Sequence, residues 1–215
     1  MHIDIYSDIV CPWCYVGKRR LERALTSVDG DVHVTWRPFQ LNPTMPLDGM
    51  DRKAYLEAKF GSLEAFGRME EQLLAAGKGE RIPFAFEKIQ RTPNTFAAHR
   101  LVWYAAQQVK QDDVVEDLFR GYFLEGKDIG DLKTLAHVAV EAGLDRTETE
   151  EFLASDKGVV EVKAEEAVGH KLGIRGVPYF MLNGTYAISG AQQPDSFVAA
   201  LKKIDAASLE RKTGG

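Results

Sequence analysis

The order of hydrophobic patterns along the chain constrains its fold more than any other feature. Apolar and polar residues alternate in residues 2–7 and 32–36, as they do in strands. Between them, from Pro12 to about Thr26, a partial apolar stripe is typical of a helix, and Gly30 lies just past its end. Two strands joined by a helix form a β-α-β unit, which we expect to be parallel and right-handed.

Helical spacing replaces the strand pattern from about Gly49 to Gly173. Apolar residues recur every three or four positions over 52–60, 63–76, 94–109, 114–124 and 131–142. Gly77 is among the glycines at plausible helix ends. Two further helices are expected over about 147–154 and 158–172, and the stretch from Gly77 to Pro93 predicts an irregular connection.

The strand pattern returns after Gly173. Residues 179–182 and 185–188 flank Asn183-Gly184, which supplies the positive φ angles of a type I′ hairpin turn. A final helix is predicted from about Pro194 to Leu209. Without the helical block, the remaining β-α-β and α-β-β-α halves have a thioredoxin-like layout. We therefore expect an α/β protein with a thioredoxin-like fold, formed by residues 1–48 and 158–215, and a large α-helical insertion, residues 49–157, that folds back as a lid or wall.

Composition and charge exclude several classes of protein. A chain of 215 residues, 45% hydrophobic and 27% charged, fits one large globular domain and not a disordered or fibrous chain. No apolar run approaches the ~18–20 residues that cross a bilayer. The net charge of -5 gives no general attraction to nucleic acid or anionic lipid, so neither partner is expected. No targeting leader is visible before the first strand, which indicates a cytoplasmic protein if Met1 is the native start.

The chain has two cysteines, Cys11 and Cys14, between its first strand and first helix. A disulfide between them would close too short a loop to be a useful structural staple. Cys-x-x-Cys is typical of a redox pair or of half a zinc site. Zinc would need further ligands from distant histidines or carboxylates, or from a second subunit, so we expect no metal. Buried, inert thiols are the remaining interpretation.

The redox interpretation has a physical basis at the helix start. Unpaired N–H groups and the helix dipole favour a thiolate at Cys11, whose pKa is therefore expected to fall. Pro12 costs no hydrogen bond at the first helical position. Cys14, one turn later, can reach Cys11 while staying less exposed. We predict that Cys11 attacks, that Cys14 resolves, and that Trp13 offers substrate an apolar contact.

Pro178 is the second notable feature, at the start of the strand over 179–182. A proline is tolerated at the first position of a strand, which is sufficient to explain it. In a thioredoxin layout, however, the loop before this strand faces the cysteine pair. A cis peptide bond between Val177 and Pro178 would present the backbone of Val177 to an extended substrate.

Several segments together resemble a known family. They are residues 11–17, 36–43, 92–95 with His99-Arg100, 176–180 and 189–192. In these segments, which span nearly the whole chain, the sequence is similar to the FrnE-like branch of the DsbA-type thioredoxin-fold oxidoreductases. The resemblance implies a thioredoxin domain with a helical insertion, Cys11 as nucleophile, Cys14 as resolving thiol and Pro178 as a cis proline.

The same segments also resemble two related groups, the 2-hydroxychromene-2-carboxylate isomerases and the kappa-class glutathione transferases. These characteristically carry a serine where Cys11 stands, and they bind glutathione. The resemblance implies an alternative function, a glutathione-dependent transferase or isomerase of small aromatic substrates. In a glutathione-binding cleft Asn94, His99 and Arg100 are candidate substrate contacts; as isolated residues they suggest a helix cap, a packed histidine and a surface cation.

The sequence thus predicts a thiol–disulfide oxidoreductase, oxidase-like or isomerase-like, that acts on protein or peptide disulfides. Substrate contacts are expected from Pro12, Trp13, Val177 and Pro178. No metal or organic cofactor is required. Because there is no third cysteine to relay electrons, recharging the pair must involve another molecule, and glutathione as co-substrate and a partner thiol protein are the candidates. A non-catalytic holdase that binds unfolded chains and a homodimeric assembly both stay open. These residues do not fix the direction of exchange.

Overall fold

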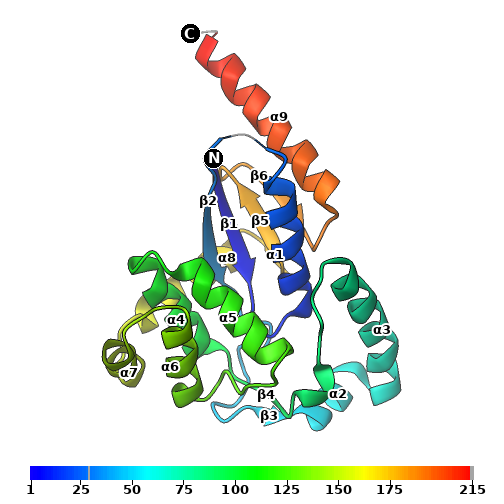
Figure 1. Cartoon of the computed structure of the whole chain (residues 1–215), viewed down its shortest axis with the longest axis vertical. Coiled ribbons are helices and arrows are strands. Elements are labelled where there is room, and N and C mark those ends of the chain that lie inside the picture. The colour runs from blue at the N-terminus through cyan, green and yellow to red at the C-terminus, as the bar shows by residue number, and fades with distance from the viewer. Residues whose placement is uncertain (29, 214–215) are drawn as a thin grey trace.

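The computed structural model describes residues 1–28 and 30–213, with side chains described as far as Ile204. Its centre is a four-stranded sheet in the order β2-β1-β5-β6 (Figure 1). The strands are β1 (His2–Ser7), β2 (His33–Pro38), β5 (Tyr179–Leu182) and β6 (Tyr186–Ser189). β1 and β2 are parallel, as predicted, and β5 and β6 join antiparallel, so Ile5 lies between Trp36 and Phe180. Asn183 and Gly184 have φ angles of 48° and 65°, as the predicted hairpin turn requires.

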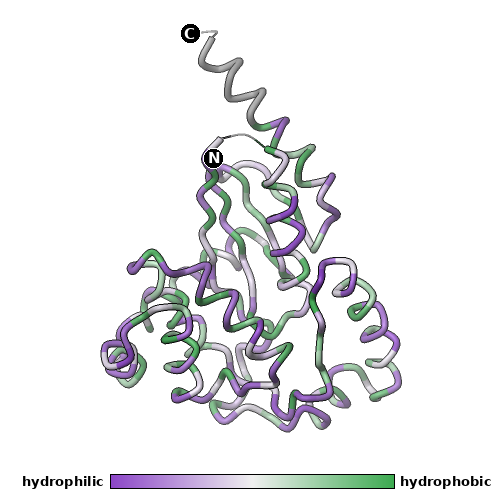
Figure 2. The backbone as a smooth tube through the Cα atoms, in the orientation of Figure 1, coloured by the Kyte–Doolittle hydropathy of each residue, from purple (hydrophilic) through white to green (hydrophobic). Residues whose placement is uncertain are grey.

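Helices cover both faces of the sheet. α1 (Pro12–Leu25) and α9 (Pro194–Thr213) lie side by side on one face, and α8 (Val159–Lys171) lies on the other (Figure 1). Phe180 of β5 meets Phe197 of α9 edge to face, with 4.8 Å between ring centroids, and both rings are fully buried. In the outer helices hydrophilic and hydrophobic segments alternate along the chain (Figure 2), as expected for helices with one face in water.

The segment of the chain that connects β2 to β5 contains the remaining helices, which lie in two groups (Figure 1). One group contains α2 (Arg52–Phe60) and α3 (Leu63–Gly79); the other contains α4 (Phe96–Gln107), α5 (Gln111–Phe123), α6 (Leu132–Glu141) and α7 (Arg146–Ala154). α4 and α5 pack against β2 as a wall, and Tyr15 of α1 stacks on Phe119 of α5 at 5.0 Å. The fold is therefore thioredoxin-like with a helical insertion, as predicted. Among the described residues no helix is both long and apolar enough to span a membrane.

The structure corrects the expected course of residues 49–93 in two places. α3 does not end at Gly77 but continues to Gly79. Gly77 is required for packing and not as a helix end, since a Cβ there would lie 2.5 Å from the ring of Phe84. Two short strands, β3 (Met50–Asp51) and β4 (Arg91–Thr92), pair where no strand is expected. Two residues are too few to show a period-two pattern. A short 3-10 turn, η1 (Phe86–Lys88), precedes β4.

Candidate active site

Cys11 occupies the N-cap of α1, with Pro12 at the first helical position. β1 ends at Ser7, and the Cys11 N–H donates to the Asp8 carbonyl at 3.0 Å, which closes the turn from strand to helix. No side chain caps the helix, unlike a helix whose N-cap serine or aspartate accepts a hydrogen bond from the first turn. A thiolate on Cys11 would supply the missing acceptor.

Cys11 meets the segment before β5, which is 166 residues away in sequence. The Val177–Pro178 peptide bond is cis, as expected, and the Cys11 thiol donates to the Val177 carbonyl oxygen at 3.5 Å. Gly17 makes this approach feasible: a Cβ there would lie 3.0 Å from Pro178 Cγ and 3.1 Å from Phe180 Cζ. Because Gly17 has no side chain, α1 can pack directly on the Pro178 ring.

The two thiols differ in exposure and in proton affinity. Both are free, and Cys11 is 5% exposed where Cys14 is 1% exposed. Burial raises the pKa of the Cys14 thiol well above its ordinary value, and the hydrogen bond and charge of Cys11 raise it further, while Ser7 and the backbone of Asp8 offset part of this rise. Cys11 is therefore the more accessible of the two thiols, and Cys14 is the thiol that burial keeps protonated.

The side chains expected to contact substrate surround Cys11. Pro12, Trp13 and Val177 are half-buried, so each keeps part of its surface open beside Cys11, and Pro178 is buried. Trp13 also packs against the hydrophobic core, which fixes the indole next to the cysteine turn.

Of the three weaker candidates, the structure brings His99 alone into contact with the turn that carries Cys11. His99 Nε2 lies 3.3 Å from Asp8 Oδ1, with both side chains almost fully buried. Asn94 fixes a loop, since its Oδ1 accepts from the Phe96 N–H at 2.9 Å and its Nδ2 donates to the Met45 carbonyl at 2.7 Å. The Asn94 side chain therefore holds the backbone of Met45 and Phe96 in place.

Arg100 is not the surface cation that the isolated residue suggests. It is 7% exposed, and its guanidinium donates to four carbonyl oxygens at and beyond the end of α7, those of Phe152, Leu153, Ser155 and Lys157. Burial lowers the pKa of Arg100. The arginine ties α4 to the C-terminal end of α7, and all of these hydrogen bonds go to backbone.

Ser7 and Asp8 are functional candidates that the sequence interpretation did not single out. Asp8 Oδ2 accepts from the Leu41 N–H at 2.7 Å, and both Ser7 and Asp8 are buried under the cysteine turn. A weak signal was present in the sequence, because two adjacent polar residues interrupt the alternating pattern where the first strand ends, shortly before Cys11. In the part of the chain that the structure describes, no cluster of three or more His, Cys, Asp or Glu residues could hold a metal ion.

Comparisons with known proteins place this geometry in a family. The model of the DSBA-like thioredoxin domain matches residues 2–202. The uncharacterized protein YwbO of Bacillus subtilis is 30% identical over 209 residues, which are 94% of this chain and 96% of YwbO. The crystal structure of a probable DsbA oxidoreductase, SCO1869 from Streptomyces coelicolor, is similar with a TM-score of 0.87 and 35% identity, over 94% of this chain and 89% of that one.

A more distant likeness concerns the fold alone. The cytosolic disulfide reductase DsbM of Pseudomonas aeruginosa, solved with GSH, has a TM-score of 0.66 and 18% identity, over 94% of this chain and 98% of DsbM. The family match covers nearly the whole chain, from β1 to α9, and includes both cysteines and Pro178. The chain belongs to the DSBA-like thioredoxin domain family of thioredoxin-fold oxidoreductases.

Proposed function

We propose that this protein is a thiol–disulfide oxidoreductase that exchanges disulfides of protein or peptide substrates through Cys11 and Cys14. The observation that carries the proposal is the asymmetry of the pair. Cys11 caps α1 and contacts the Val177 carbonyl, whereas Cys14 is buried behind it with a raised pKa. This arrangement suits an attacking thiol in front and a resolving thiol behind.

The exchange would proceed in two steps. The Cys11 thiolate attacks one sulfur of the substrate disulfide, forms a mixed disulfide and releases the other substrate sulfur as a thiolate. Cys14 then gives up its proton and attacks the Cys11 sulfur, so that the second substrate sulfur leaves and the pair ends oxidised. The same steps in reverse oxidise a dithiol substrate. Pro12, Trp13, Val177 and Pro178 would form the surface on which the substrate chain lies.

Glutathione is the co-substrate that we propose for recharging the pair, with a partner thiol protein as the other candidate. The support comes from DsbM, a neighbour in fold that was solved with GSH. DsbM is also a cytosolic disulfide reductase, which favours a cytoplasmic place for the present chain. Within the family we assign the chain to the FrnE-like branch, on the motifs around Cys11 and Pro178. The proposal requires no metal or organic cofactor.

The test is a Cys14→Ser variant incubated with glutathione disulfide and, separately, with a peptide disulfide. Without a resolving thiol, the mixed disulfide on Cys11 should persist, so intact-mass spectrometry should show one adduct per chain. The wild-type protein should instead become oxidised with no lasting adduct. Cys11→Ser is the matched control and should form no adduct, because its remaining thiol is buried and protonated.

The same variants separate the alternatives. If Cys14→Ser forms no adduct, dithiol exchange is contradicted. If it keeps full turnover of a small aromatic substrate with glutathione, the transferase or isomerase interpretation is correct instead. If a double alanine variant at both cysteines still prevents aggregation of an unfolded protein as well as wild type, the function is that of a holdase.

A further inference from the structure

Three buried polar atoms beneath the cysteine pair have no hydrogen-bond partner among the described residues. They are Ser7 Oγ, Asp8 Oδ1 and His99 Nε2, on side chains that are 3% exposed or less. A buried polar group without a hydrogen bond costs free energy, so such groups are few in native proteins, and each one calls for a specific explanation such as bound water or a catalytic role. Asp8 Oδ1 and His99 Nε2 lie 3.3 Å apart, which makes them an ion pair when the imidazole is protonated.

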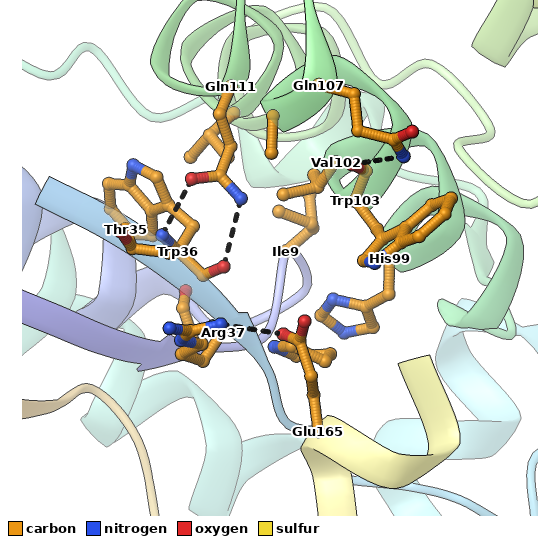
Figure 3. A pocket seen from close by; sticks show the side chains of 14 residues that line it. Ile9, Thr35, Trp36, Arg37, His99, Val102, Trp103, Gln107, Gln111 and Glu165 are labelled. Carbon is orange, nitrogen blue, oxygen red and sulfur yellow. Dashed lines mark hydrogen bonds and ion pairs between the residues drawn. The ribbon is translucent and has the colours of Figure 1, made fainter. Parts of the chain in front are cut away.

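Ser7 and His99 both border one cavity, of about 130 Å³, between β2 and α4 (Figure 3). Apolar side chains, among them Ile9, Val102 and Val115, form much of its wall. Ala106 and Gln107 also line it and are exposed, so the cavity reaches the surface on the α4 side. The cavity therefore leads from solvent to two of these three side chains, Ser7 and His99.

The polar groups nearer the surface already have partners. Gln111 bonds to the backbone of Trp36 at 2.9 and 3.0 Å, and Arg37 of β2 pairs with Glu165 of α8 at 3.4 Å (Figure 3). Ser7 Oγ and His99 Nε2 are the fully buried side-chain atoms of this lining that have no hydrogen-bond partner among the described residues. The volume accommodates about four water molecules at roughly 30 Å³ each, and water bound there would satisfy both side chains.

We propose that Ser7, His99 and Asp8 form a relay that takes the thiol proton of Cys14 during the resolving step and returns it to solvent through this cavity. The inference rests on the proposed function, because it concerns the second step of dithiol exchange. It assigns a role to Ser7 and Asp8, and it gives His99, a residue of the helical insertion, a part in the chemistry of the thioredoxin domain.

Cys14 needs such a relay because its burial disfavours the thiolate. The Ser7 hydroxyl makes no hydrogen bond of ordinary length, but it lies near enough to Cys14 to lower the pKa of that thiol. Ser7 is therefore the member of the relay that interacts with the Cys14 thiol. His99, which lies across the same cavity, is the acceptor, and the carboxylate of Asp8 stabilises the imidazolium that forms.

The step balances in atoms and electrons. Cys14 Sγ forms a bond to Cys11 Sγ as the bond between Cys11 and the substrate sulfur breaks, and the electron pair of that bond leaves on the substrate thiolate. The Cys14 proton moves to Ser7, which passes its own hydroxyl proton through cavity water to His99. His99 later releases the proton through the cavity to solvent.

The test follows the two steps separately, with 5,5′-dithiobis(2-nitrobenzoate) as the disulfide and the reduced full-length chain. Attack by Cys11 releases a first equivalent of coloured thiolate, and resolution by Cys14 releases a second in a unimolecular phase. In Ser7→Ala and in His99→Gln the ratio of the second rate to the first should fall by about tenfold. This is less than the 10²–10⁴ of a direct general base, because cavity water remains as an acceptor.

Thr35→Val is the matched control, since Thr35 lines the same cavity without belonging to the relay, and it should leave the ratio unchanged. Ser7→Ala removes an unpartnered buried hydroxyl, so its unfolding free energy should equal or exceed that of wild type and cannot account for a slow second phase. The relay is overturned if wild type releases two equivalents and both variants keep the ratio within about twofold. If wild type releases only one equivalent, the proposed function itself fails.

Discussion

Gly17→Ala tests whether the contact between α1 and Pro178 is as tight as the structure indicates. The new methyl group would lie 3.0 Å from Pro178 Cγ and 3.1 Å from Phe180 Cζ. The Pro178 ring is rigid, and Phe180 is fully buried against Phe197, so neither neighbour can swing aside as a flexible chain end would. The substitution therefore forces α1 and β5 apart.

Two opposing effects set the magnitude. Replacing glycine by alanine within a helix stabilises by about 0.8–1.0 kcal/mol, because glycine has the greater backbone freedom to lose. Adding a methyl group to a well-packed core costs about 1–3 kcal/mol. The net effect at Gly17 should be a loss of roughly 0–2 kcal/mol in the free energy of unfolding.

Gly67→Ala, in the middle of α3, is the matched control. A Cβ there meets no atom within 4 Å, so this variant should gain the ~0.8–1.0 kcal/mol of helix propensity and lose nothing. Urea unfolding of both variants measures the difference, which should be about 1–3 kcal/mol in favour of Gly67→Ala. Equal stabilisation in the two variants would refute the packing explanation for Gly17.

Two further predictions concern groups outside the cysteine pair. Arg100→Met should lower the free energy of unfolding by at least about 1–3 kcal/mol, because it leaves buried carbonyls at the end of α7 unpaired. The rates of thiol exchange should stay at wild-type values. If exchange is lost while stability is unchanged, Arg100 is a substrate contact instead. Burial raises the pKa of Tyr122 from 10.0 to about 12. The folded state thus holds this proton more tightly than the unfolded state does, so stability present below pH 10 falls as pH rises to about 12, by roughly 2–3 kcal/mol. Urea unfolding across this range should show a shallower decline in Tyr122→Phe, and identical declines would argue against the shift.

The sequence determined the parts of the fold whose signals are local. Period-two alternation located β1, β2 and β5, and Asn183-Gly184 specified the turn between β5 and β6 through its two positive φ angles. Pro12 and the residues before it placed Cys11 at a helix start, which needed no knowledge of the rest of the chain. These features depend on the conformations that a few adjacent residues allow.

The features that the sequence left open depend on contacts between distant segments. Helical periodicity puts His99 and Arg100 on α4, but it does not say that one meets Asp8 and the other the end of α7. Glycine is common at helix ends, so the sequence suggests an end at Gly77. In the structure Gly77 lies within α3 and packs against Phe84, which is seven residues further along the chain. Such pairings follow from the path of the whole chain.

The contact between Cys11 and Val177 has a consequence for how the protein is made. These residues are 166 positions apart, and the ladder between β1 and β5 bridges a similar separation, from Ile3 to Leu182. A ribosome adding about 5–20 residues per second needs roughly 8–33 s to cover that distance. Throughout that interval the nascent chain carries both thiols without the strand that faces them. The surroundings of Cys11 are therefore complete only after residues 177–182 have been synthesised and the returning strand has closed this long loop.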